Sequence, residues 1–450
     1  MVELTIGTLV TLIVGRCIFK GYSATGILLS GGLLLLAITA LLGKPVLPES
    51  VPTTGNVVTD IFEYVRFLLN SRGGGLGMLI MVLCGFAGYM SHIGANTMLV
   101  KLASKPLGVI KSPYVLLVAA YLVACAMSLA VSSATGLGVL LMATLFPLMV
   151  NMGISRGAAA AVCASPAAII LSPTSGDVVM AAQAANMELI DFAFKLTLPI
   201  SLTSIAAMAV THFFWQRYLD KRSGEVNEQV AAGDLITTAP AYYAILPFTP
   251  IIGVLIFDGK LGPQLDIVTI IVMCLTLSAL LELARHRDGK GLLDGLQVCW
   301  RNMADAFAGV VMLLVGAGVF AQGLMTIGFI DTLLAHAQDL GSGGAIMMLS
   351  LVVITTLAAF TTGSGNAPFY AFVELIPNLA SSLGINPAYL VIPMLQASNL
   401  GRTISPVSGV VVACSGMANL SPFEVVKRTS LPVAVGLAVV LIATQIMVPA

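Results

Sequence analysis

The sequence predicts an all-α protein that crosses a membrane many times and consists of two inverted repeats. Three observations predict this fold class: a composition poor in charge, long apolar runs, and an internal duplication. Hydrophobic residues make up 58% of the 450 residues and charged residues 9%, whereas a soluble domain carries about 25% charged residues. So few charges cannot cover a surface that faces water, and most of the surface must therefore face lipid.

Apolar runs of the length that crosses the hydrocarbon recur along the chain, at residues 25–42, 76–91, 192–214, 264–281 and 431–449. A transmembrane helix needs roughly 20 such residues. The runs do not alternate apolar and polar residues as the strands of a membrane barrel do. The N-terminal stretch has no basic residue before its apolar part, so we expect a retained span and not a cleaved signal.

The two halves of the chain match at a nearly constant offset, which indicates an internal duplication. The first repeat is expected at residues 1–215 and the second at 241–450, with a polar linker at 216–240. The clearest matches are Phe86-Ala87 with Phe320-Ala321, Ser172-Pro173-Thr174-Ser175-Gly176 with Ser405-Pro406-Val407-Ser408-Gly409, Asn186 with Asn419, and Leu198-Pro199 with Leu431-Pro432.

Each repeat is expected to contain scaffold helices, a hairpin of two apolar arms, an interrupted helix and a final helix. The hairpins are expected at 113–151 and 344–380, and the interrupted helices at 157–185 and 388–416. Proline and glycine within these apolar stretches break the helical hydrogen bonding. With re-entrant hairpins, the chain would have about ten transmembrane helices.

The basic residues predict the orientation. Five crossings in each repeat, an odd number, make the second repeat inverted relative to the first. Fifteen of the 21 basic residues then fall on one face and five on the other, and Arg402 falls on neither. Because Lys and Arg remain on the cytoplasmic side, the rich face and the linker are predicted to be cytoplasmic and both termini periplasmic. The five basic residues on the other face, predicted to be periplasmic, are Lys44, Arg66, Arg72, Lys195 and Lys260.

Several partner classes are not expected. The 21 basic and 21 acidic residues give zero net charge, which does not suggest a nucleic acid partner. The seven cysteines and four histidines are scattered without ligand spacing, so neither a metal site nor a cofactor is expected. The partners must be membrane lipid and whatever the membrane-embedded polar residues bind.

Polar residues gather at the hairpin tips and helix interruptions, where a buried helix should be apolar. Half-helices that begin there direct unpaired N–H groups and positive dipole ends into a cavity near the membrane midplane, and hydroxyl groups complete a site for an anion. The alternative is that small and hydroxyl residues let helices pack closely. The candidates are Ser132, Ser133, Thr135, Gly136, Thr174, Ser175, Thr362, Ser364, Gly365, Asn366, Asn399, Arg402, Thr403, Ser405 and Ser408.

Arg402 is the most informative candidate. A charged side chain at the bilayer centre costs about 2.5 to 3.5 kcal/mol on insertion scales and usually marks function. Its planar guanidinium fits a carboxylate. One carboxylate of a dicarboxylate would bind Arg402, and the other would bind hairpin-tip N–H groups and hydroxyls. The alternative is a structural ion pair with Asp177.

Asp177 and Glu374 are the two acidic residues placed deep in the apolar stretches. A carboxyl group in this position can carry a proton through a transport cycle, so both are candidates for coupling. Alternatively, Asp177 caps a helix or pairs with Arg402, and Glu374 reaches the wet end of its arm near Pro377.

Seven stretches resemble the DcuC type of anaerobic C4-dicarboxylate transporter, and the resemblance extends over essentially the whole chain. They are GYSATG (21–26), HIGAN (92–96), SLAVSSATGLGVLLMATLFP (128–147), SPTSGDVV (172–179), HFFWQRYLDK (212–221), TTGSGNAPFYAFVE (361–374) and QASNLGRTISPVSGVVV (396–412). The resemblance implies a bacterial inner-membrane carrier and not an enzyme. Such a carrier exports succinate in fermentation, exchanges it for fumarate, also takes malate, and uses protons.

The resemblance also implies membership of the wider ion-transporter superfamily, in which a transport domain with two hairpins moves as an elevator against scaffold helices. Sodium-coupled dicarboxylate carriers of that superfamily bear Ser-Asn-Thr at the tips. Here the tips read Ser132-Ser133-Ala134-Thr135 and Thr362-Gly363-Ser364-Gly365, so protons are expected and sodium is left open. A homodimer is left open as well.

Three other readings compete. An inorganic-ion carrier such as a sodium/proton antiporter has the same architecture, but a cation site would be expected to hold several deep acids and no arginine. An intramembrane enzyme would need a nucleophile with a base, and the polar breaks contain neither His nor Lys. A passive channel would be recognised by a flux that does not saturate.

Overall fold

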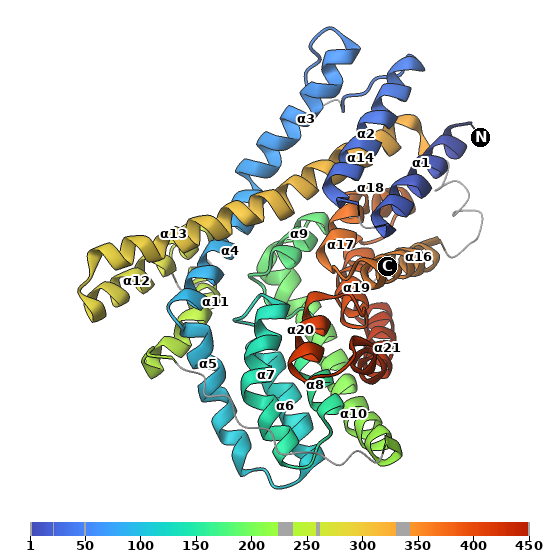
Figure 1. The fold of residues 1–450 in the computed structure, drawn as a ribbon. Coiled ribbons are helices and arrows are strands. Elements are labelled where there is room, and N and C mark those ends of the chain that lie inside the picture. Colours follow the sequence, from blue (N-terminus) through green and yellow to red (C-terminus); the bar gives the residue numbers. More distant parts are fainter. Residues whose placement is uncertain are drawn as a thin grey trace.

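The computed structural model describes residues 2–20, 22–48, 51–223, 237–257, 262–329 and 343–448. Within these ranges the chain is helical and contains no β-strand (Figure 1). Seven of the described helices are long and apolar enough to cross a membrane, and a bent pair gives an eighth. Large apolar side chains such as Phe214, Leu280 and Ile446 are exposed, as a lipid-facing surface requires. The chain is a multi-pass helical membrane protein.

The scaffold helices of the first half include one that the apolar runs did not indicate. Helix α3 is joined to α4 at Gly75 with a bend of 44°. Asp60, Glu63, Arg66 and Arg72 make α3 polar enough to resemble a loop in sequence. The helices of this part are α1 (Val2–Phe19), α2 (Ala24–Leu41), α3 (Val57–Gly74), α4 (Leu76–His92), α5 (Ala95–Ser104) and the short η1 (Lys105–Val109).

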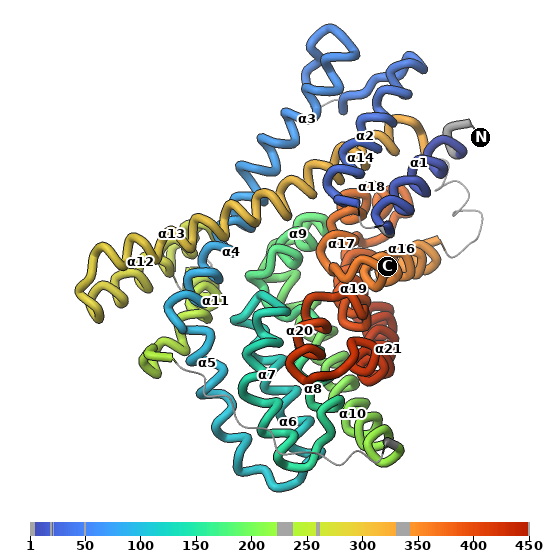
Figure 2. The backbone as a smooth tube through the Cα atoms, viewed as in Figure 1, coloured from blue at the N-terminus to red at the C-terminus, as the bar shows by residue number. Residues whose placement is uncertain are grey.

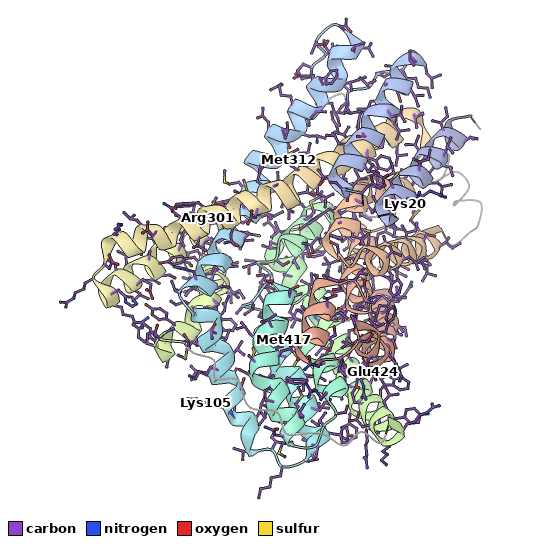
Figure 3. All side chains as sticks on the ribbon, in the orientation of Figure 1. Lys20, Lys105, Arg301, Met312, Met417 and Glu424 are labelled. Atoms are coloured by element: carbon purple, nitrogen blue, oxygen red, sulfur yellow. The ribbon has the colours of Figure 1, made fainter. Side chains whose placement is uncertain are left out.

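The equivalent helices of the second half are straighter. Helices α13 and α14 form one 39-residue helix, Gly289–Ile327, through a π-helical turn (Figure 2). Arg301 lies on α13 (Figure 3), which packs against α4 and α12. The elements are η4 (Ala241–Phe248), α11 (Thr249–Ile256), α12 (Ile267–His286), α13 (Gly289–Ala306), η5 (Phe307–Val311) and α14 (Met312–Ile327).

The stretches expected to be hairpins, 113–151 and 344–380, are helical on both sides of a short polar tip, and the arm after the second tip is divided into two helices. At the first tip, Ser133 accepts a hydrogen bond from the N–H of Gly136 at 3.1 Å and caps the second arm. The first hairpin consists of α6 (Pro113–Met127) and α7 (Ala134–Asn151), and the second of α16 (Gly343–Thr362), α17 (Asn366–Val373) and α18 (Ile376–Leu383).

Non-helical segments separate helices in two further parts of the chain. The backbone is non-helical at 169–175 and 405–408 apart from turns. The first consists of α8 (Arg156–Ala164), the short η2 (Pro166–Ala168) and α9 (Gly176–Ala184), and the second of α19 (Pro387–Thr403) and α20 (Gly409–Met417).

Each half closes with a long helix, η3 (Asp191–Thr197) continuing into α10 (Leu198–Ser223), and α21 (Pro422–Met447). Helix α10 extends to Ser223, so the first part of the expected linker is helical, and residues 224–236 lie outside the described residues. Backbone conformations recur at the offset of the repeat. Asn186 and Asn419 have φ of 54° and 53°, which is uncommon for a residue other than glycine. The two asparagines are 233 residues apart, which is the offset of the sequence matches.

Candidate functional site

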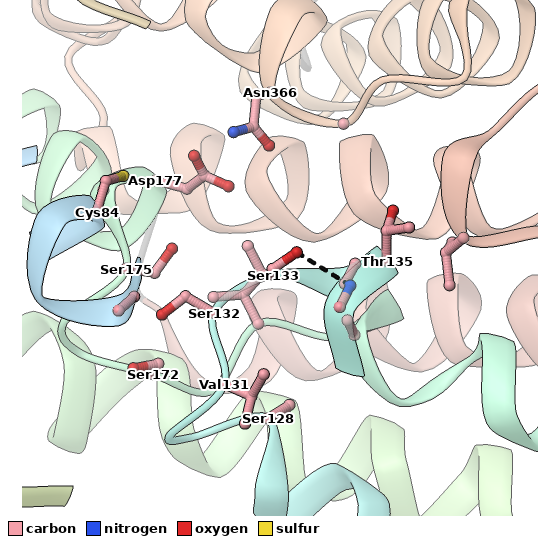
Figure 4. Close-up of a pocket in the computed structure, with 18 of the residues that line it drawn as sticks. Cys84, Ser128, Val131, Ser132, Ser133, Thr135, Ser172, Ser175, Asp177 and Asn366 are labelled. Carbon is pink, nitrogen blue, oxygen red and sulfur yellow. Dashed lines mark hydrogen bonds between the residues drawn. The ribbon is translucent and has the colours of Figure 1, made fainter. Parts of the chain in front are cut away.

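A cavity of about 1250 Å³ lies where the two hairpin tips meet the two interrupted helices. Helices α4, α13 and α14 contribute Ile80, Asn302 and Leu313 to its wall. Ser132, Ser175, Asp177 and Asn366 surround one open space in the close-up (Figure 4). The cavity therefore gathers polar groups from four segments that are far apart in the sequence.

Twelve of the fifteen predicted binding residues line this cavity. They are Ser132, Ser133, Thr135, Gly136, Thr174, Ser175, Ser364, Gly365, Asn366, Asn399, Arg402 and Ser408. The side chains of the other three form hydrogen bonds with backbone groups. Thr362 donates to the carbonyl of Ala358 at 2.7 Å, Thr403 donates to that of Asn399 at 2.9 Å, and Ser405 accepts from the N–H of Val407 at 3.4 Å. These three fit the packing alternative.

The second interruption lies between both hairpin tips. A Cβ atom on Gly363, whose φ is +71°, would lie 2.8 Å from the carbonyl oxygen of Val407. A Cβ atom on Gly409 would lie 3.1 Å from Oγ1 of Thr135. Small residues are therefore needed for the tips to approach the interruption this closely.

Arg402 reaches from the second interrupted helix to the first. Its Nη2 donates to the carbonyl oxygen of Ala167 at 3.0 Å. Its buried Nε has no hydrogen-bond partner among the described residues. Asp177 lines the same cavity, but these two described side chains do not form a direct ion pair and each has another partner. The structure thus lacks the ion pair that was the alternative for Arg402.

Asp177 has a different partner. It is 5% exposed and its Oδ1 accepts a hydrogen bond from the hydroxyl of Tyr370 on α17 at 2.5 Å. Both residues line the cavity. This pair was not predicted from the sequence, because a tyrosine in an apolar helix usually contributes to packing.

Glu374 lies outside the set of cavity-lining residues that the structure describes. It forms an ion pair of 2.5 Å with Arg72, at the end of α3. The Glu374 side chain is 11% exposed, so the pair, and not the wet end of the arm, accommodates the charge. This pair joins the first half of the chain to the second hairpin.

Two helix N-termini open into the cavity. In the described part of the chain, neither Ser175 before α9 nor Ser408 before α20 makes a side-chain cap hydrogen bond. Ser408 is fully buried and its hydroxyl lacks a partner there. Uncapped N–H groups, a free hydroxyl and a guanidinium suit an anion. No group of His, Cys, Asp and Glu that could hold a metal ion occurs in the described ranges.

Comparison with known proteins decides among the readings. The family profile for DcuC, described as a C4-dicarboxylate anaerobic carrier, matches residues 2–449. The chain belongs to the DcuC family. The resemblance seen in the motifs is confirmed along the whole chain, and membership of this family of carriers excludes the intramembrane enzyme.

Two relatives of the DcuC family are similar over their whole lengths. The anaerobic C4-dicarboxylate transporter DcuC of Escherichia coli K12 is 69% identical over 448 residues, which cover 100% of this chain and 97% of that protein. The probable anaerobic C4-dicarboxylate transporter DcuC of Vibrio cholerae is 61% identical over 452 residues, covering 100% and 98%.

Two solved structures share the fold of this DcuC-family chain. The YdaH transporter of Alcanivorax borkumensis superposes with a TM-score of 0.64 at 18% identity, over 94% of this chain and 97% of that one. MtrF of Neisseria gonorrhoeae superposes with a TM-score of 0.59 at 12% identity, over 94% of each chain. At these identities the comparison bears on the fold alone.

Proposed function

We propose that this DcuC-family chain is a secondary active transporter of C4-dicarboxylates in the bacterial inner membrane. Succinate, fumarate and malate are the proposed substrates, with succinate efflux and fumarate/succinate exchange as the transport modes. The observation that carries the proposal is Arg402, a cavity-lining cation whose buried Nε has no partner in the described part of the chain. A carboxylate fits the guanidinium and would supply that partner.

Two carboxylates need two sites. One would bind the guanidinium of Arg402. The other would bind the hydroxyl of Ser408 and the uncapped N–H groups at the start of α9 or α20, which lie on the same cavity. Helix N-termini favour negative charge because their N–H groups are unpaired and the helix dipole is positive there. A substrate with one carboxylate would use only half of this arrangement.

The proposed transport cycle moves one part of the protein against the other. The hairpins and interrupted helices form the moving part, and the scaffold helices form the static part. The two repeats are inverted, with about ten transmembrane helices and two re-entrant hairpins, and both termini are periplasmic. The position of the cavity supports this proposal, because its wall includes residues of both sets, such as Ser364 and Asn302.

Protons are the proposed coupling ion. Asp177 is the better placed of the two acidic candidates, because it lines the cavity with Arg402. Glu374 is the weaker candidate, because Arg72 already balances its charge.

The proposed function is tested by uptake of labelled succinate into proteoliposomes that contain the purified protein. Internal fumarate should accelerate uptake, and uptake should saturate with succinate concentration. A linear, unsaturable flux would indicate a channel, and sodium-proton exchange without dicarboxylate movement would indicate the inorganic-ion carrier.

A further inference from the structure

Gln396 makes an unusual set of hydrogen bonds. It lies on α19, six residues before Arg402, and its side chain is fully buried. Its Oε1 accepts from the N–H of Ile170 at 2.9 Å, and its Nε2 donates to the carbonyl of the same residue at 3.2 Å. Because the backbone N–H of Ile170 can only donate, the orientation of the amide is fixed.

Ile170 belongs to the non-helical stretch of the first interrupted helix. Its backbone groups therefore lack the partners that a continuous helix would supply, and an unpaired peptide group is costly inside a membrane. Ser201 of α10 also donates to the carbonyl of Ile170, at 3.2 Å, and accepts from Nε2 of Gln396 at 3.1 Å. Together, Gln396 and Ser201 stabilise the non-helical conformation of this stretch.

The short helix η2, directly before this stretch, contacts Arg402. Ala167, three residues before Ile170, accepts the hydrogen bond from Nη2 of Arg402. Helix α19 thus contacts the first interruption at two points, through Gln396 and through Arg402. The residue that matches Gln396 in the other repeat, 233 positions earlier, is Cys163, so the duplication supplies this amide only once.

We propose that Gln396 is a positioning residue for the carboxylate site. By holding Ile170, it fixes the carbonyl of Ala167 and so directs the guanidinium of Arg402 toward the cavity. The inference rests on the proposed function, in which Arg402 binds a substrate carboxylate. Gln396 is absent from the cavity-lining residues that the structure describes, so it acts through Ile170 and Ala167. Substrate affinity should then depend on Gln396 only while Arg402 is present.

Purified Gln396→Leu protein tests this proposal, with Gln322→Leu as the matched control. Gln322 is another buried amide, 5% exposed, whose Nε2 donates to the carbonyl of Val46 at 3.1 Å. Both variants should melt at a lower temperature. Only Gln396→Leu should also weaken succinate binding, by about tenfold, because a misplaced charged contact loses part of its strength. Its maximal exchange rate at saturating succinate should change less than its affinity.

The double variant Gln396→Leu with Arg402→Gln separates positioning from general damage. If Gln396 acts through Arg402, it should add less than about threefold to the loss of affinity that Arg402→Gln causes alone. The proposal would be overturned if the loss of succinate affinity in the double variant equalled the product of the two single losses. Wild-type succinate affinity in folded Gln396→Leu protein would overturn it as well. If the leucine variant does not fold, Gln396→Met, of nearly the same length, is judged by the same outcomes, and Ser201→Ala should give a smaller loss of the same kind.

The two proposals fail differently. Wild-type succinate affinity in folded Arg402→Gln protein would contradict the carboxylate site itself. Weakened binding in Arg402→Gln together with normal binding in Gln396→Leu would contradict only the positioning role.

Discussion

The hydroxyl of Tyr370 donates a 2.5 Å hydrogen bond to Asp177 and thereby joins the second hairpin to the first interrupted helix. We expect Asp177→Asn to retain succinate/fumarate exchange, which needs no net proton movement, and to lose pH-driven accumulation. Tyr370→Phe should impair accumulation in the same sense, because a hydrogen bond to a charged group contributes about 1.5 to 3 kcal/mol. Exchange and accumulation are measured in the same proteoliposomes.

Tyr121→Phe is the matched control for Tyr370→Phe. Tyr121 is also fully buried, but its hydroxyl donates to Sδ of Met208 at 3.6 Å and not to a carboxylate. This variant should accumulate succinate normally. Normal accumulation in Asp177→Asn would remove Asp177 from the coupling mechanism.

The ion pair between Arg72 and Glu374 predicts a compensating double variant. Arg72→Gln or Glu374→Gln alone leaves a partly buried charge without its partner and should lower the melting temperature. The double variant should recover most of that loss, with a coupling energy of about 0.5 to 3 kcal/mol. If the double variant is stable and still accumulates succinate under a pH gradient, Glu374 does not carry the coupling proton.

The close approach of Gly363 to Val407 predicts that the second hairpin tip has no room for a larger residue. Gly363→Ala should nearly abolish transport, because a Cβ atom there would lie 2.8 Å from the carbonyl oxygen of Val407. Gly384→Ala is the control, since Gly384 also has a positive φ, +66°, yet no described atom lies within 4 Å of a Cβ there. Both substitutions carry a backbone cost of about 1 to 2 kcal/mol. Equal transport by both variants would contradict a tight fit at the tip.

The parts of the fold that were predictable from sequence are those with a local signal. Proline, glycine and polar residues within apolar stretches marked both interruptions and both tips. Helix α3 was missed because its charges are accommodated by the fold: Asp60, for example, accepts hydrogen bonds from the Thr53 hydroxyl at 2.7 Å and the Thr54 N–H at 2.6 Å. A hydropathy profile counts such a residue as polar whether or not the folded protein supplies its hydrogen bonds.

The contacts within the candidate site were not predictable, because they join residues far apart in the chain. Tyr370 and Asp177 are 193 residues apart, and Gln396 and Ile170 are 226 apart. A single sequence shows that Arg402 and Asp177 are both deep, and opposite charges suggest an ion pair. In the structure, Asp177 instead accepts a hydrogen bond from Tyr370, and Arg402 donates one to the backbone carbonyl of Ala167. Which polar groups meet depends on helix packing, which has no local signal.

The charge distribution predicts the orientation in the membrane. In a cysteine-free variant, a single cysteine at the exposed position Lys221 should resist a membrane-impermeant thiol reagent added from the periplasm. One at the exposed position Pro52 should react. Labelling after permeabilisation controls for accessibility. The reverse pattern would contradict periplasmic termini and the positive-inside assignment.

Arg402 provides the most direct test of the proposed function. Arg402→Lys keeps the positive charge and loses the planar fork, so it cannot contact both Ala167 and a carboxylate as the guanidinium can. Truncating one partner of a buried charged contact costs about 2 to 5 kcal/mol, which corresponds to roughly 30-fold to several-thousand-fold weaker binding. Succinate affinity and exchange by the purified variant, together with its melting temperature, measure the effect.

The double variant Arg402→Gln with Asp177→Asn distinguishes a substrate contact from a structural pair. If the two residues only balanced each other, removing both charges would restore stability and transport. Because Arg402 and Asp177 have other partners in the described structure, we expect the double variant to fold but to bind succinate as weakly as Arg402→Gln alone. Recovery of succinate affinity in the double variant would show that Arg402 does not bind the substrate carboxylate.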